Sequence, residues 1–176
     1  MNKSNAAEKK PVAPRTKKAK DTTQEKLPEH VLIRVRSEDG QTIKVHGDII
    51  SQKGSAILGK IGQSLSAAFI KSLNEQISRN VETYLFLTIR EGWDGEYVTY
   101  QCLLKNVSAE LDKTKIDLVP EYYSVSYKDI KTWFEISAMG RMTRDNMNRI
   151  FVFSSDRPIM SVIKSTAAVF RVGLRK

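Results

Sequence analysis

The sequence has almost none of the residues on which cross-linked, metal-binding or membrane-spanning proteins depend. Cys102 is the single cysteine in 176 residues, which excludes an intramolecular disulfide framework and favours a reducing compartment. His30 and His46 are the only histidines, and with one cysteine they are too few for a zinc site, so we expect no metal and no cofactor. No apolar run approaches the roughly 18 residues that span a bilayer, and the lysine- and proline-bearing start is unlike a signal peptide.

Motifs typical of catalysis are also missing. No GxSxG or HExxH occurs, and GSAILGKIG resembles a phosphate-binding loop only in part, because the glycine spacing and the Ser or Thr after the lysine are lacking. A nucleophile pair of Cys102 and His46 is the remaining alternative. Because Cys102 lies in an apolar segment, a buried and inert thiol is the better interpretation. We therefore expect a protein that is not an enzyme.

Positive charge is concentrated at the two ends of the chain. The net charge is +9, of which residues 1–30 carry +4, residues 31–140 carry −1 and residues 141–176 carry +6. Two basic ends around a neutral middle favour anionic partners such as nucleic acid, acidic lipid headgroups or an acidic protein. The alternative is that the charge only keeps the protein in solution.

The first 29 residues predict a disordered basic arm. They contain three prolines and few large apolar side chains, so burial cannot offset the entropy lost on ordering. PRTKKAK within the arm resembles a nuclear-localisation or phosphate-binding cluster, which leaves the nucleus open as a location. The arm's candidate contacts to lipid or nucleocapsid are Lys9, Lys10, Arg15, Lys17, Lys18 and Lys20.

Residues 30–176 predict a single compact α+β domain with an antiparallel sheet and a few helices. VLIRVR and TIKVH flank an Asp-Gly turn signal and predict a first hairpin, with Arg34, Arg36 and Lys44 facing outward. Apolar spacings of three and four then predict a helix from an N-cap at Asp48, firm over residues 64–79.

TYLFLTIRE and EYVTYQCLLKNV, joined by GWDG, predict a second hairpin at the centre of the sheet. Trp93 in its turn is a candidate partner anchor, unless the ring folds back over the hairpin. Further on, IDLVPEYYSVSYK predicts a strand interrupted by Pro120, DIKTWFEIS a helix or strand, and IFVFSS a short strand. Residues 156–170, with Asp156 as cap and Pro158 in the first turn, predict a helix, with a strand as the alternative.

Arginines gather near the C-terminal end, and guanidinium groups suit phosphate oxygens. The alternative is that these arginines pair with carboxylates of the core. Aromatic residues among them look buried, so we expect mainly electrostatic contacts, indifferent to base sequence. These candidate polyanion contacts are Arg141, Arg144, Arg149 and Arg157.

The order of these features resembles that of matrix proteins of negative-strand RNA viruses, in size most of all the small ones of plant rhabdoviruses. The segments that carry the resemblance are EKKPVAPRTKKAK, HVLIRVRSEDGQTIKVHGDII and the basic C-terminal end. The arm lacks the PPxY or PTAP motif of animal relatives, so the resemblance does not extend to budding through the adaptors of those motifs.

The resemblance implies a self-associating structural protein of the virion and host cytoplasm. Such a protein bridges a nucleocapsid to an acidic membrane surface as a peripheral homo-oligomer. The alternative function is an RNA-binding regulatory protein of the movement, silencing-suppressor or ribosome-associated type, which uses the same basic patches on RNA directly.

Overall fold

The computed structural model describes residues 27–35, 41–90, 95–125, 127–165 and 167–175. The predictions for the basic arm up to residue 26, for Arg36 and for Trp93 lie outside these ranges. The described elements, in chain order, are β1 (His30–Arg34), α1 (Gln41–Lys53), β2 (Ala56–Ile61), α2 (Ala67–Ser78), β3 (Tyr84–Arg90), β4 (Tyr97–Ser108), the 3₁₀ helices η1 (Lys113–Leu118), η2 (Glu121–Val125) and η3 (Tyr127–Asp129), β5 (Ile130–Arg141), α3 (Arg144–Asn148), β6 (Ile150–Val152), α4 (Ile159–Val162) and β7 (Val169–Leu174).

The described strands form one sheet of seven in the order β2-β5-β4-β3-β1-β7-β6. Neighbouring strands run antiparallel except for β1 and β3, which pair in parallel. The predicted α+β class is confirmed, and so is the second hairpin, because all of β3 pairs with residues 97–103 of β4. β3 is the fourth strand of seven, the predicted central position.

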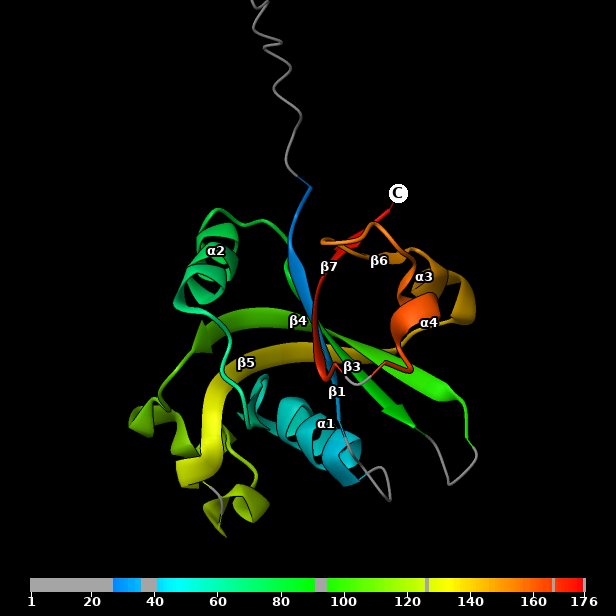
Figure 1. Cartoon of the computed structure of the whole chain (residues 1–176). Coiled ribbons are helices and arrows are strands. Elements are labelled where there is room, and N and C mark those ends of the chain that lie inside the picture. The colour runs from blue at the N-terminus through cyan, green and yellow to red at the C-terminus, as the bar shows by residue number, and fades with distance from the viewer. Residues whose placement is uncertain (1–26, 36–40, 91–94, 126, 166, 176) are drawn as a thin grey trace, which may run out of the picture.

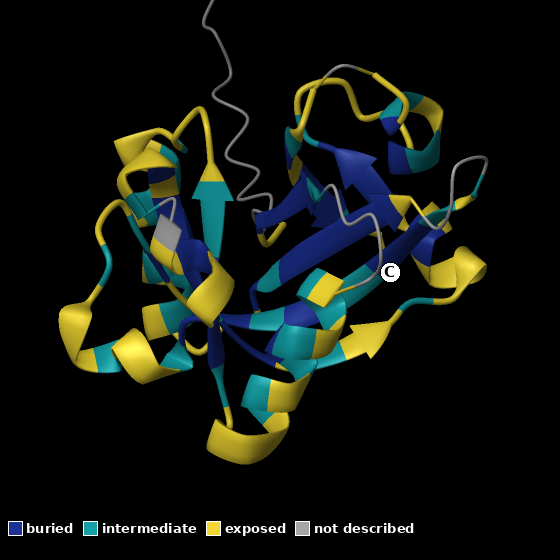
Figure 2. Ribbon diagram, turned by 90° about the horizontal axis from the view of Figure 1, so that it is seen from below, coloured by how far each residue is buried: buried dark blue, intermediate teal, exposed yellow. Residues whose placement is uncertain are grey.

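Helices cover both faces of this sheet (Figure 1). On one face, α1 and α2 pack over alternate side chains of the inner strands, among them the fully buried Leu85 and Leu87. On the other face, Phe86 packs with Ile159 and Ile163 from the C-terminal segment. β3 is therefore buried on both sides, as the dark strands in the middle of Figure 2 show. The helices and connections around the sheet carry most of the exposed residues.

The first predicted hairpin is wrong, because residues 41–53 form α1. The alternation of TIKVH is also compatible with a helical face, on which Ile43, His46 and Ile50 fall at spacings of three and four and pack toward the core. Lys44 is thus on a helix surface, paired with Asp48 at 2.6 Å, and Asp48 is not an N-cap. The true partners of β1 are β3 and β7.

The long predicted helix is interrupted by a strand. Gly54 ends α1 with a left-handed backbone (φ 81°), and its N–H donates to the Ile50 carbonyl. Ala56–Ile61 then forms the edge strand β2. The firm portion of the prediction is confirmed by α2, whose N-cap Ser66 accepts a hydrogen bond from the Phe69 N–H.

Two further predictions in the C-terminal half differ from the structure. The segment around Pro120 forms the 3₁₀ helices η1 to η3, not a strand. Residues 156–170 are helical only over Ile159–Val162, and the chain then enters β7, which fills the place between β1 and β6. Asp156 lies in a left-handed conformation (φ 52°) and is not the helix cap.

The described chain is attached to the fold from Glu29 onward, a residue that the predicted arm included. The Glu29 N–H donates to Gln76 Oε1 and its carbonyl accepts from Gln76 Nε2, both at 2.7 Å. Its fully buried carboxylate accepts from Ser72 Oγ and Arg171 Nη2. Arg171 also lies over the ring of Phe69. These contacts join the start of β1, α2 and β7.

Candidate functional site

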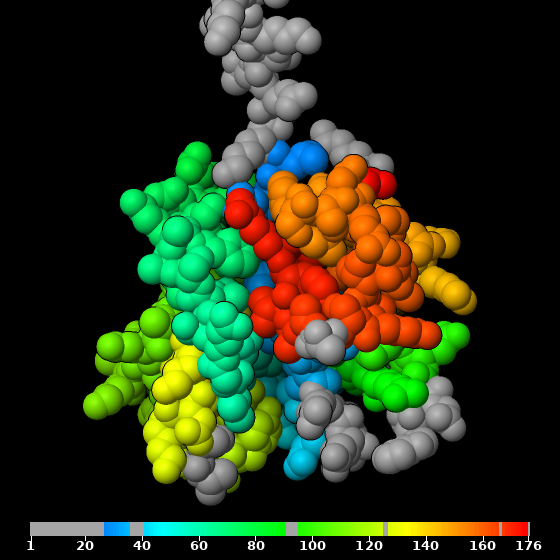
Figure 3. Space-filling model, viewed as in Figure 1, coloured from blue at the N-terminus to red at the C-terminus, as the bar shows by residue number. Residues whose placement is uncertain are grey.

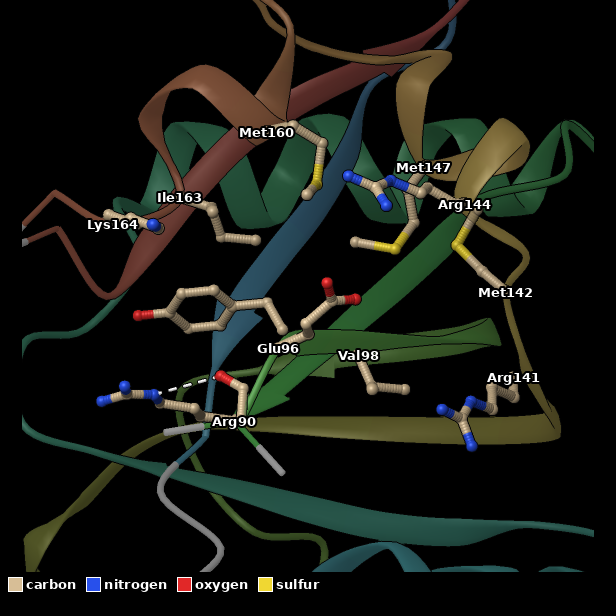
Figure 4. Close-up of a pocket in the computed structure, with 12 residues that line it drawn as sticks. Arg90, Glu96, Val98, Arg141, Met142, Arg144, Met147, Met160, Ile163 and Lys164 are labelled. Atoms are coloured by element: carbon tan, nitrogen blue, oxygen red, sulfur yellow. Dashed lines mark hydrogen bonds between the residues drawn. The ribbon is translucent and has the colours of Figure 1, made fainter. Parts of the chain in front are cut away.

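A pocket of about 560 Å³ lies where the C-terminal helices meet the ends of β3 and β4. The C-terminal residues occupy one continuous region of the surface, orange to red in Figure 3. Figure 4 shows the pocket with side chains entering from the strands on one side and from the segment of α3 and α4 on the other. Its lining residues are Arg90, Gly95, Glu96, Tyr97, Val98, Arg141, Met142, Arg144, Met147, Met160, Ile163 and Lys164.

Four cations surround the pocket and come from distant parts of the sequence. Arg90 ends β3, Arg141 ends β5, Arg144 begins α3 and Lys164 follows α4. The Arg90 Nε donates to the Gly95 carbonyl at 3.3 Å, which fixes its guanidinium beside the opening. Within the described ranges, neither Arg144 nor Lys164 has a hydrogen bond or ion pair. Their charges therefore remain available to an anion.

The wall opposite the strands is apolar and rich in methionine. Met142, Met147 and Met160 contribute thioether side chains, and Ile163 lies beside them (Figure 4). Met147 is buried, whereas Met142 and Met160 are partly exposed to the pocket. Methionine is unbranched and polarisable, so such a wall adapts to flat or irregular apolar ligands.

Glu96 is the one acidic side chain among the lining residues. It is exposed, and within the part of the chain that the structure describes it makes no hydrogen bond or ion pair. A carboxylate at neutral pH only accepts hydrogen bonds, so Glu96 opposes phosphate and favours amino groups at its place in the pocket.

A second pocket, of about 360 Å³, adjoins the first and shares Arg141 and Met142 with it. Its further lining includes the ring of Tyr84 and the amides of Gln101 and Asn146. Gln101 lies on β4 four residues beyond Tyr97, and both point to the same sheet face because strand side chains alternate. We call the two pockets together the basic groove.

The structure brings together two of the C-terminal arginines predicted to bind polyanions, Arg141 and Arg144, and leaves two apart. Arg149 does not line the groove, and its Nε donates to the Arg175 carbonyl at 2.8 Å. Arg157 is exposed and also lies outside the lining of the groove. The alternative was that these arginines pair with carboxylates of the core. The described side-chain hydrogen bond of Arg149 is instead to a backbone carbonyl.

Sequence reasoning missed Arg90 and Lys164. Arg90 lies in the middle of the chain, where the charge is balanced, so no local signal marked it. Lys164 belongs to the +6 C-terminal segment but lies apart from its arginines. A usable signal was the spacing of methionine: four of the five methionines fall within residues 139–160.

The titratable residues considered for catalysis or metal binding do not line the groove and are buried. Cys102 is fully buried in the core, and desolvation raises the pKa of its thiol to about 12. Burial lowers the pKa of His30 to about 4, and its Nδ1 accepts from the Tyr84 N–H. Burial also lowers the pKa of His46, whose Nδ1 lies 2.7 Å from the Thr42 carbonyl oxygen.

The His46 Nε2 has no hydrogen-bond partner in the described structure. No group of three or more His, Cys, Asp or Glu within the described ranges is arranged to hold a metal ion. Over the same ranges, every helix is too short or too polar to cross a bilayer.

Comparison with known proteins adds no relative: no family model, no curated protein and no solved structure matches this chain.

Proposed function

We propose that this protein is a non-enzymatic assembly protein of the matrix type, which binds RNA or a nucleocapsid through the basic groove. The observation that carries the proposal is the gathering of four cations, from β3, β5, α3 and the turn after α4, around one concave surface. Each was placed there by the fold, since Arg90 and Lys164 are 74 positions apart in the chain. Clustered lysine and arginine side chains are the electrostatic footprint of phosphate binding.

The concave shape of the groove favours a polymer over a bilayer. A flat layer of lipid headgroups reaches the rim cations but leaves the apolar wall of Met142, Met147 and Met160 uncovered. A flexible strand of RNA enters the groove and brings its phosphates to the rim. We therefore assign RNA or nucleocapsid binding to the groove.

Attraction to an acidic membrane is assigned to the charge of residues 1–30, which carry +4. Each basic residue near an acidic leaflet contributes about 1 kcal/mol. Several such contacts in a self-associated array add by avidity. The two basic ends of the chain thus have separate partners in this proposal.

Two binding assays on the full-length protein test this division. The groove variant Arg141→Glu/Arg144→Glu should lose RNA binding, measured by fluorescence anisotropy, and should still float with vesicles of phosphatidylserine and phosphatidylcholine. An arm variant with glutamine at the six candidate lysine and arginine positions should show the reverse. Equal loss of both activities in each variant would contradict the assignment of one partner to each end.

Self-association separates the proposal from the alternative of a regulatory RNA-binding protein. Sedimentation velocity of nuclease-treated protein at low salt should show species that grow with concentration. A single monomeric or dimeric species across that range would favour the regulatory alternative.

A further inference from the structure

We propose that the basic groove binds single-stranded RNA with one unstacked base inserted against the methionine wall. The inference rests on the proposed RNA binding and deepens it, because it names the strand form and adds a contact to the base. It also departs from the sequence-based expectation of mainly electrostatic contacts, because the structure has a pocket beside the arginines.

The volume and lining of the first pocket suit a flat, partly apolar group. Its volume of about 560 Å³ is within the usual range of small-molecule sites, whereas a phosphate alone needs only surface cations. The thioethers of Met142 and Met160 and the ring of Tyr97 border the same space. Aromatic rings stack on any base, and thioether sulfur makes favourable contacts with aromatic rings.

The position of Glu96 distinguishes a base from a phosphate as the occupant. A carboxylate within the pocket repels a phosphodiester anion but accepts hydrogen bonds from the amino and imino groups on base edges. The four cations around it then hold the sugar-phosphate chain outside the pocket. With the base inside and the phosphates at the rim, Glu96 faces hydrogen-bond donors of the base, and Arg144 and Lys164 face phosphates.

The second pocket extends this arrangement along the strand. Arg141 belongs to both pockets, so it lies where the backbone passes from one to the next. Beyond it, the amides of Gln101 and Asn146 offer donors and acceptors for a second base edge. Tyr84 supplies a ring in this pocket as Tyr97 does in the first.

A double helix cannot make these contacts. In A-form RNA the bases are paired and stacked, and proteins reach mainly the backbone and the shallow minor groove. A duplex would therefore touch Arg144 and Lys164 at the rim and leave the methionine wall empty. The structure predicts selection of single strands over duplexes.

The test compares three probes on the full-length protein, of which the single strand and the abasic oligomer have equal numbers of phosphates. They are a fluorescein-labelled single-stranded RNA of ten nucleotides, its duplex, and a ten-unit abasic ribose-phosphate oligomer. One inserted base is worth about 1–3 kcal/mol, so the single strand should bind about 5- to 150-fold more tightly than the abasic oligomer. A 2-aminopurine in the strand should also gain fluorescence as it leaves its stacked neighbours.

Substitutions that leave the net charge unchanged test where the base binds. Tyr97→Leu and Met160→Ser should each reduce affinity for the single strand several-fold and leave affinity for the abasic oligomer unchanged. Ile116→Ser is the matched control, because Ile116 is exposed on η1 and does not line the groove. Thermal unfolding of each variant verifies the fold, and the two substitutions on different elements keep the test valid if one fails to fold.

The outcomes separate this inference from the proposed function. Equal affinity for the single strand and the abasic oligomer would overturn base insertion and leave RNA binding by the groove in place. Absence of binding to all three probes at low salt would overturn both. Preference for the duplex would also contradict the inference, because only rim contacts are open to paired RNA.

Discussion

Neutralising the groove cations should reduce the salt dependence of RNA binding by a calculable amount. For single strands, each phosphate neutralised by the protein contributes about −0.7 to the slope of log affinity against log salt. Arg144 and Lys164 are the groove cations without a described bond, and together they account for about −1.4 of that slope. Replacing both, Arg144→Gln and Lys164→Gln, should therefore make the slope shallower by about 1.4.

These two residues are the best choice because neither has a described bond whose loss would weaken the fold. Both side chains are exposed, so the substitutions leave the core unchanged. The matched control is Lys71→Gln on α2, which packs on the opposite face of the sheet. Lys71 is 77% exposed and only weakly paired with Glu75, at 3.8 Å.

Anisotropy titrations of a ten-nucleotide single-stranded RNA at several salt concentrations measure the effect. Between 50 and 200 mM salt, the unaltered protein should lose about sevenfold more affinity than the double variant. The Lys71→Gln control should keep the original slope. The reasoning is refuted if the double variant keeps the slope, or if the control lowers it equally, since the groove would then contribute no more than any surface lysine.

Three further predictions concern the stability of the fold. Arg171→Met removes the guanidinium that pairs with the buried carboxylate of Glu29 and should cost about 2 kcal/mol in urea unfolding, less than a fully buried pair because the arginine side chain is 49% exposed; an unchanged midpoint would show that the ion pair adds no stability. Burial lowers the pKa of His30 to about 4, so the unfolded chain binds a proton first and unfolding free energy should fall by up to about 3 kcal/mol between pH 6.5 and 4; His30→Gln should remove that part of the pH dependence, and an identical pH profile for the variant would contradict the assignment. Gly173→Ala places a Cβ 2.5 Å from Cζ of the buried Phe151 ring and should cost about 1–3 kcal/mol; a thermal midpoint equal to that of the unaltered protein would show that the ring moves freely.

Two extended patterns were predicted correctly from sequence. The helix α2 is 12 residues long, and the strands β3 and β4 of the second hairpin are 7 and 12 residues long. The helix follows from apolar spacing and the hairpin from strand propensity. The five-residue alternation TIKVH was misread, because such a short segment fits the core-facing side of either a strand or a helix. Packing of Ile43 and Ile50 against the sheet selected the helix.

The candidate site was predictable only in part. Arg141 and Arg144 could be proposed from a local run of arginines, but that run also contained Arg149, which the fold uses to bind a backbone carbonyl. Arg90 and Lys164 join the groove through the pairing of β3 with β4 and through the turn after α4. The spacing of residues along the chain gives no information on which distant segments come into contact.

By itself the sequence determined the distribution of charge, the scarcity of reactive groups and the α+β class, because these depend on composition and on periodicities within one segment. Only the tertiary structure decided the parallel pairing of β1 with β3, the insertion of β7 between β1 and β6, and the concave surface shared by Arg90, Arg141, Arg144 and Lys164. The physical reason is that strand order and pocket lining follow from burying all apolar faces at once, which no local pattern specifies.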